Sequence, residues 1–151
     1  MIILLGLISC SQTDKVEGEG ETGEAVVEQP QAIIPAVCPE NEPTAVMTTN
    51  GCVLGISGSG QDRFFNVPYA KAPVGELRWK RPIQSDPWEE PLDGTIVGDY
   101  CTQYTEIGLG GSEDCLNLNI LRPEGSNSDS NLPILFFTHG GSYTSGAGSL
   151  D

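Results

Sequence analysis

A glycine-rich segment near residue 140 offers the most specific chemistry in the sequence. Residues 132–137 form an apolar run, which ends abruptly and is followed by His139, Gly140, Gly141 and Ser142. Glycines after a strand let backbone N–H groups approach a ligand, because no Cβ stands in the way. Preorganised backbone donors stabilise the anionic oxygen that develops during acyl transfer. The segment therefore predicts an anion-binding loop, and a glycine-rich strand exit without chemistry is the alternative.

His139 is the only histidine in the sequence and invites a role as general base. A base must reach the hydroxyl of its nucleophile within about 2.6–3.2 Å, whereas a histidine beside anion-binding glycines faces a different task. The sequence also contains no G-x-S-x-G, the sharp turn that presents a nucleophilic serine. We therefore expect neither the base nor the nucleophile among these residues.

Several apolar segments could form the strands that position the loop. The run at 132–137 is typical of a strand buried on both faces of a parallel sheet. Residues 116–121 show the alternation of a half-buried strand, and residues 63–67 form a shorter apolar stretch. Trp79 and Trp88 lie in a proline-rich segment, where we expect both to pack as apolar anchors. No convincing amphipathic helix accompanies these strands, so an α/β fold with few helices is expected.

An antiparallel hairpin is expected at the start of the folded part. Residues 45–49 and 52–56 flank Asn50 and Gly51. Asn-Gly is a strong signal for a type I′ turn, in which both central residues have a positive φ. The sequence therefore predicts a type I′ hairpin centred on these two residues.

The charge of the chain argues against one class of partner. Its formal net charge is −14 and Lys plus Arg total only 7, whereas nucleic-acid binding relies on clustered basic residues that neutralise phosphates. Gly55, Gly58 and Gly60 do not form a G-x-G-x-x-G that opens a helix, so a dinucleotide cofactor is not expected either.

The first ten residues, MIILLGLISC, suggest export. They are too short to span a bilayer, which needs about 20 apolar residues, but they fit the hydrophobic part of a secretory signal. The last four resemble a bacterial lipobox, so we expect lipidation of Cys10 and a membrane anchor at the bacterial cell envelope. No Lys or Arg precedes the run, and a frayed apolar terminus is the alternative. Residues 11–44 are too polar and acidic to order, and we expect a flexible tether.

Four cysteines remain when Cys10 is set aside, and they allow three pairings. We expect Cys38–Cys52 and Cys101–Cys115, which close two local loops and suit an oxidising compartment. The alternative is four buried free thiols. None of the cysteines forms C-x-x-C, so the spacing does not recommend a structural zinc site.

The sequence from residue 46 onward resembles the N-terminal portion of type-B carboxylesterases, the α/β-hydrolase family that includes the cholinesterases. Six ordered motifs carry the resemblance: FNVPYA from Phe65, PVGELRW from Pro73, PW from Pro87, GDYCTQ from Gly98, SEDCLNLNI from Ser112 and HGGSYTSG from His139. The departures from the family pattern are Asn66 and Val67 in place of Gly and Ile, Asn117 in place of an aromatic residue, and Ser142 in place of a glycine.

The resemblance implies a function and a set of site residues. The N–H groups of Gly141 and Ser142 would form two arms of an oxyanion hole, with Gly140 shaping the turn. The complete enzyme would hydrolyse small-molecule carboxylic esters through an acyl-enzyme, with no cofactor. The Ser, Asp or Glu, and His of the triad would follow this sequence, so we expect the chain to be inactive alone. The alternative is a cholinesterase-like surface protein that binds without catalysis.

The resemblance also implies two structural features and an incomplete domain. The disulfide Cys101–Cys115 and an ion pair between Arg78 and Glu113 are expected. Residues 45–151 would be the N-terminal part of the family domain, a truncated α/β-hydrolase that holds the hairpin and the first strands of a mainly parallel sheet.

Overall fold

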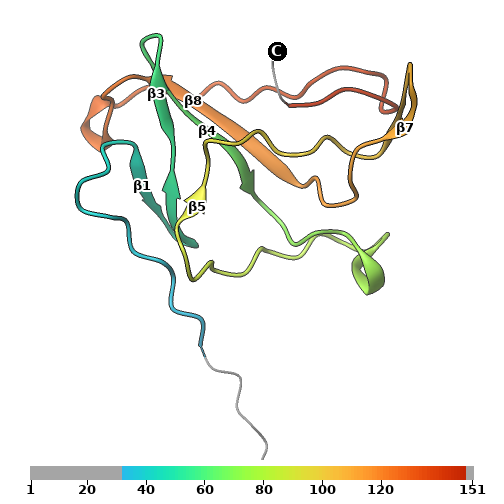
Figure 1. The fold of residues 1–151 in the computed structure, drawn as a ribbon, viewed down its shortest axis with the longest axis horizontal. Coiled ribbons are helices and arrows are strands. Elements are labelled where there is room, and N and C mark those ends of the chain that lie inside the picture. The colour runs from blue at the N-terminus through green and yellow to red at the C-terminus, as the bar shows by residue number, and fades with distance from the viewer. Residues whose placement is uncertain (1–31, 149–151) are drawn as a thin grey trace, which may run out of the picture. The chain divides into compact units, whose positions relative to one another are not determined.

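The computed structural model describes residues 32–148, whose regular elements are mainly β strands joined by long loops (Figure 1). The strands are β1 (Ala45–Thr48), β2 (Gly51–Leu54), β3 (Ile56–Gly58), β4 (Gln61–Pro68), β5 (Leu92–Asp93), β6 (Gln103–Thr105), β7 (Gly108–Gly110) and β8 (Asn117–Pro123). Two 3-10 helices, η1 (Gly75–Leu77) and η2 (Ser128–Ser130), complete the elements. Among the described residues, no helix has the length and apolar character needed to cross a bilayer. The expected lipidation at Cys10 and the tether up to residue 31 lie outside the described residues.

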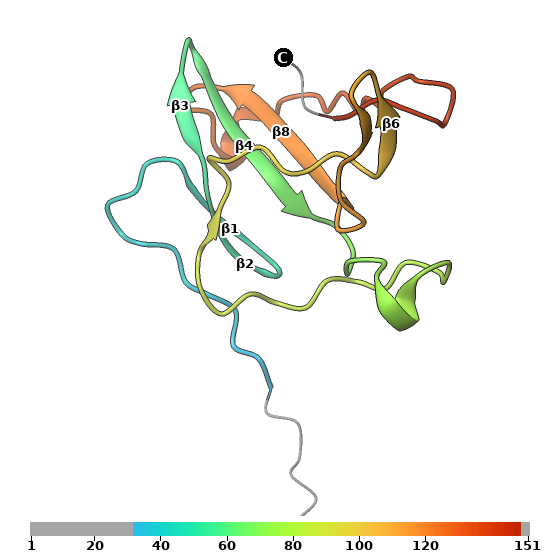
Figure 2. The ribbon, with the colours of Figure 1, turned by 45° about the vertical axis from the view of Figure 1, so that its right-hand side comes forward.

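The strands form three small sheets, in the orders β1-β2-β5, β3-β4-β8 and β6-β7 (Figure 2). Within residues 32–148, β2 and β5 pair in parallel and the other strand pairs are antiparallel. The mainly parallel central sheet expected of the complete domain stays a prediction, since the strand pairs described here are mostly antiparallel. Short turns between successive strands build hairpins, whereas parallel strands need a long crossover connection.

The type I′ turn predicted at Asn50 and Gly51 is wrong. Thr48 pairs with Gly51, so the loop consists of Thr49 and Asn50, and Asn50 has no positive φ. Gly51 nevertheless has a φ of 130°, and a Cβ there would lie 2.6 Å from the ring of Trp88. The positive φ values of a type I′ turn occur instead in the β3–β4 loop, at Ser59 and Gly60 (56° and 76°).

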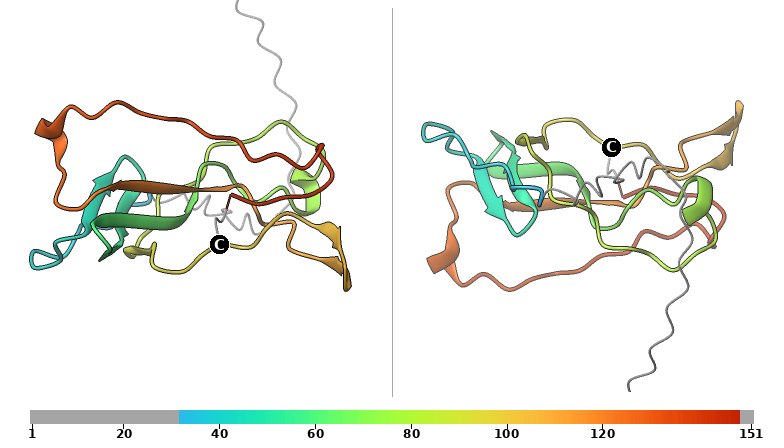
Figure 3. Two further views of the ribbon diagram at one scale, coloured as in Figure 1. Left: turned by 90° about the horizontal axis from the view of Figure 1, so that it is seen from above. Right: turned by 90° about the horizontal axis from the view of Figure 1, so that it is seen from below.

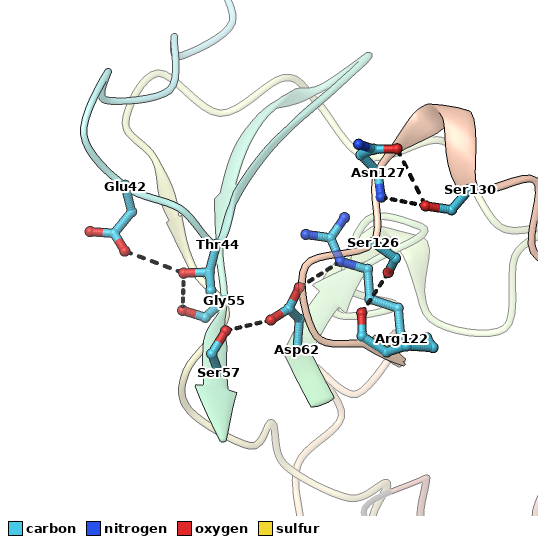
Figure 4. Close-up of polar contacts among 10 residues, drawn as sticks. Glu42, Thr44, Gly55, Ser57, Asp62, Arg122, Ser126, Asn127 and Ser130 are labelled. Atoms are coloured by element: carbon cyan, nitrogen blue, oxygen red, sulfur yellow. Dashed lines mark hydrogen bonds and ion pairs between the residues drawn. The ribbon is translucent and has the colours of Figure 1, made fainter. Parts of the chain in front are cut away.

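A polar network ties the second sheet together (Figure 4). Asp62 on β4 is buried, accepts a hydrogen bond from the Ser57 hydroxyl and forms a 3.0 Å ion pair with Arg122 on β8. The Ser57 hydrogen bond holds the pKa of Asp62 below its usual value; Arg122 acts in the same direction, while desolvation opposes both. Three strands therefore meet at one ionised carboxylate.

Part of the segment that we expected to be a tether packs against the first sheet. Ala36 is buried, its N–H donates to the Trp88 carbonyl at 2.8 Å, and its carbonyl accepts from Cys52 at 2.9 Å. A disulfide joins Cys38 to Cys52. The expected tether boundary at residue 44 is therefore wrong, because the predicted Cys38–Cys52 disulfide and the hydrogen bonds of Ala36 already join this segment to the first sheet.

Only one of the two tryptophans packs as predicted. The Trp88 indole is partly buried and donates to the Cys52 carbonyl at 2.8 Å. Trp79 is 91% exposed, with the Arg78 guanidinium 5.7 Å from its ring centre. The prediction for Trp79 is wrong, since no element of residues 32–148 covers the segment that follows η1.

The apolar run at 132–137 forms no strand in the structure. Ile134 is 95% exposed and Leu135 92% exposed, and the segment runs past the sheets without pairing (Figure 3). A strand buried on both faces needs a partner strand and covering layers. The described residues supply neither, so the prediction of a buried strand here is not met.

Candidate functional site

The glycine loop, residues 139–146, contains a tight left-handed turn. The carbonyl of Gly141 accepts the N–H of Thr144 at 3.0 Å and that of Ser145 at 3.1 Å. The two residues inside the turn, Ser142 and Tyr143, have φ values of 55° and 61°. Positive φ at both central positions is the signature of a type I′ turn, which normally favours Gly or Asn. This turn therefore holds two unfavourable residues in a strained conformation.

The turn leaves the candidate donors available. The carbonyl of Gly141 accepts both hydrogen bonds of the turn, and the N–H groups of Gly141 and Ser142 form no hydrogen bond within residues 32–148. The loop is exposed throughout this region. Both amides are therefore free to bind an anionic oxygen, whereas an amide buried in the protein would already be paired.

Two of the loop glycines leave no room for a side chain. A Cβ at Gly141 would lie 1.8 Å from the Ser145 carbonyl oxygen. A Cβ at Gly146, whose φ is 109°, would lie 2.5 Å from the His139 ring and 2.6 Å from the Gly140 carbonyl oxygen. His139 thus packs against the far end of the loop. That His139 is not the general base stays a prediction.

Gly140 differs from these two glycines. A Cβ there would meet no atom of the described residues within 4 Å. Its expected role in shaping the turn is therefore not supported by a steric requirement in this part of the chain.

Two side-chain amides connect the loop to the sheets. Gln103 on β6 donates from Nε2 to the Gly146 carbonyl at 2.9 Å and accepts the Gly146 N–H on Oε1 at 2.7 Å. Asn119 on β8 donates from Nδ2 to the Gly148 carbonyl at 3.0 Å. Sequence reasoning assigned no role to either residue, although both belong to motifs that carry the family resemblance.

Asn119 also contacts an irregularity in β4. Its Oδ1 accepts the N–H of Asn66 at 3.1 Å, where the β4–β8 register shifts between Phe64 and Val67. Asn66 stands where the resembled pattern has glycine, and its φ is 54°. Asn tolerates this left-handed conformation better than other residues with a side chain, so the departure preserves the backbone geometry.

The predicted disulfide and ion pair both form near β6 and β7, the hairpin that carries Gln103. Cys101 and Cys115 are bonded across a sequence separation of 14 residues. Arg78 Nε lies 2.8 Å from Glu113 Oε1, and both side chains are about half exposed. An exposed pair contributes about 0–1 kcal/mol, so the covalent link is the stronger constraint. Across residues 32–148, no group of three His, Cys, Asp or Glu side chains could hold a metal ion.

Comparison with known proteins decides the family. The family model described as "Carboxylesterase family" matches residues 42–150, more than half of the chain. The chain belongs to the carboxylesterase family. Among its relatives in this family, para-nitrobenzyl esterase of Bacillus subtilis is 39% identical over 112 residues, and gut esterase 1 of Caenorhabditis elegans is 38% identical over 108. Each alignment covers 69% of this chain, but only 22% and 19% of those esterases.

Solved carboxylesterase structures share the fold of this part of the chain. A structure of PNB esterase matches with a TM-score of 0.64 at 39% identity, covering 71% of this chain and 22% of that one. A carboxylesterase of Geobacillus stearothermophilus matches with a TM-score of 0.63 at 36% identity, covering 70% of this chain and 21% of its own. The chain therefore spans about a fifth of the length of these esterases.

Proposed function

We propose that the protein containing this chain is a serine carboxylesterase, in which the N–H groups of Gly141 and Ser142 stabilise the oxyanion. The observation that carries the proposal is the left-handed turn at Ser142 and Tyr143, next to the Gly141 and Ser142 amides, which have no hydrogen-bond partner among residues 32–148. Strained backbone at functional sites persists because it preorganises the groups that bind the substrate. Family membership supports the reaction class.

The two amides act when the ester carbonyl is attacked. A serine oxygen adds to the carbonyl carbon, and the carbonyl oxygen takes up the negative charge. The two N–H groups donate to that oxygen, and each donor contributes about 10²–10³ in rate. Collapse of the tetrahedral intermediate expels the alcohol and leaves an acyl-enzyme, which water then hydrolyses. The amides serve both halves of the reaction, since an oxyanion forms in each.

The triad is expected in residues that follow this sequence, because no G-x-S-x-G occurs within it. On this proposal, the 151-residue chain supplies the oxyanion donors but does not hydrolyse esters by itself. The substrate is a small-molecule carboxylic ester, and no cofactor takes part.

We further propose that the protein is exported and anchored through Cys10. The two disulfides support an oxidising compartment, and the LISC sequence before residue 11 supports lipidation. Mass spectrometry of the mature N-terminus tests the anchor. Diacylglyceryl-Cys10 is the expected result, and an unmodified peptide that retains Met1 would contradict it.

The esterase proposal is tested with the full-length protein. We expect it to hydrolyse p-nitrophenyl butyrate and to form a covalent adduct with a fluorophosphonate, whereas residues 1–151 alone do neither. A well-folded full-length protein that neither hydrolyses the ester nor reacts with the fluorophosphonate would contradict the esterase proposal. That outcome would favour the non-catalytic binding protein.

A further inference from the structure

The segment that contains the glycine loop depends on side chains for its attachment. Within the described residues, every hydrogen bond that links residues 132–148 to the rest of the chain involves Gln103 or Asn119. The segment pairs with no strand, and its other hydrogen bonds are internal. The position of the loop therefore depends on two amide side chains, and Gln103 is the one that contacts the loop itself.

Gln103 is also restrained by contacts outside the loop. Its Nε2 also donates to the Cys101 carbonyl at 3.0 Å. Around it, the N–H of Thr102 donates to the Ser112 carbonyl, and the N–H of Ser112 donates to the Tyr100 carbonyl. The Cys101–Cys115 disulfide closes this region covalently. The backbone around Gln103 is therefore restrained, so the hydrogen bonds of its side chain can fix the position of Gly146.

An amide side chain suits this task better than the alternatives. Gly146 presents one donor and one acceptor, and Gln103 satisfies both with the matching groups of its amide. A carboxylate can only accept, and an ammonium can only donate. Views from two directions bring β6 and the loop segment together (Figures 1 and 2), in agreement with these hydrogen bonds.

Fixing Gly146 fixes both ends of the loop. Gly146 lies against the His139 ring and the Gly140 carbonyl, at the other end of the same loop. The candidate oxyanion donors, Gly141 and Ser142, lie between these contacts. A displacement of Gly146 therefore moves the donors.

We propose that Gln103 is a positioning residue for the oxyanion loop, acting through Gly146 on the amides of Gly141 and Ser142. This inference rests on the proposed esterase function. Gln103 contacts no reacting atom, so its loss weakens the transition state by misplacing the donors. A misplacement of about 1 Å can cost roughly 100-fold in rate. Substrate binding in the ground state depends less on the donors, so kcat should change more than KM.

The test compares two variants of Gln103 with a control in the full-length protein. Gln103→Met keeps the length of the side chain and removes all of its hydrogen bonds, whereas Gln103→Glu keeps an acceptor for the Gly146 N–H. Gln84→Met is the matched control, since Gln84 is exposed and makes no hydrogen bond within residues 32–148. Steady-state hydrolysis of p-nitrophenyl butyrate and amide hydrogen exchange across residues 139–148 are measured for each.

We expect Gln103→Met to lower kcat by roughly 100-fold, to leave KM nearly unchanged and to accelerate exchange at Gly146. Gln103→Glu should keep much of the Gly146 protection and still lower kcat, and Gln84→Met should match the wild type. An unchanged kcat in either Gln103 variant, or equal exchange in Gln103→Met and wild type, would overturn the proposal. If the wild type hydrolyses no ester, the esterase proposal fails, and exchange at Gly146 alone decides whether Gln103 holds the loop.

Discussion

The side-chain amide of Gln103 pairs with the backbone of Gly146 through two hydrogen bonds, across 43 residues of sequence. One partner belongs to the GDYCTQ motif and the other to the HGGSYTSG motif. The contact links a disulfide-braced hairpin to the glycine loop that carries the candidate oxyanion donors. Two sequence motifs that look independent therefore form one structural unit.

Gly141→Ala should disrupt the loop, because its new Cβ would lie 1.8 Å from the Ser145 carbonyl oxygen. We expect kcat of the full-length esterase to fall by about 10²–10³, the cost of losing an oxyanion donor. Gly140→Ala is the steric control for stability, since a Cβ there meets no described atom. Equal melting temperatures for Gly141→Ala and Gly140→Ala would contradict the steric argument.

Ser142→Gly should preserve activity and relieve strain. The left-handed conformation costs a residue with a Cβ about 1–2 kcal/mol, and replacing Ser142 with glycine removes this cost. Glycine also has more freedom in the unfolded chain, which lowers the free energy of unfolding by about 0.5–1 kcal/mol. The net expectation is a small rise in the free energy of unfolding, measured by urea denaturation, with kcat unchanged. Ser142→Val, with a branched Cβ at the same φ, should be destabilised. The reverse order of stability would show that the turn is not left-handed at this residue.

Removal of the disulfide Cys101–Cys115 should make the backbone around Gln103 more mobile. Cys101 and Cys115 are 14 residues apart, and closing a loop of this size stabilises a protein by about 3 kcal/mol. The double variant Cys101→Ser and Cys115→Ser should lose roughly that free energy of unfolding and show faster exchange at Gly146. A large loss of stability with unchanged exchange at Gly146 would mean that the hairpin and the loop are not coupled.

Acid should destabilise the second sheet through Asp62. The folded-state pKa of Asp62 is lowered, first by the Ser57 hydrogen bond and then by Arg122, from an ordinary value of 3.8. A depressed pKa contributes stability that is fully present above that value and is lost as the pH falls through the folded-state pKa. In urea titrations, Asp62→Asn should lower stability at neutral pH and flatten its dependence below pH 3.8. Asp129→Asn, at an exposed site without a side-chain partner in residues 32–148, should match the pH dependence of the wild type. If Asp62→Asn loses stability in acid as steeply as the wild type does, Asp62 is not the group responsible.

Some of this molecule could be anticipated from sequence because the signals are local. The glycines after the apolar run predict a loop at residues 139–146, and both disulfides close short loops. β4 contains the apolar stretch at 63–67, and β8 begins at Asn117, within the stretch at 116–121. In each case, a residue type and its near neighbours carry the information.

The features that were missed depend on distant partners. Single polar residues such as Gln103 and Asn119 produce no periodic pattern, and their partners lie 43 and 29 residues away. Gly51 was assigned to a turn because nothing in its local sequence reveals that Trp88 fills the space beside it. The run at 132–137 was assigned to burial from its composition, but composition does not provide the strands that would cover it.

The most direct test is a crystal structure of the full-length protein with a phosphonate bound covalently at its nucleophile. The phosphonyl oxygen stands in for the oxyanion of the tetrahedral intermediate. We predict that it accepts hydrogen bonds from the N–H groups of Gly141 and Ser142 at about 2.7–3.1 Å. A phosphonyl oxygen that binds elsewhere, with these two amides paired to other protein groups, would contradict the account.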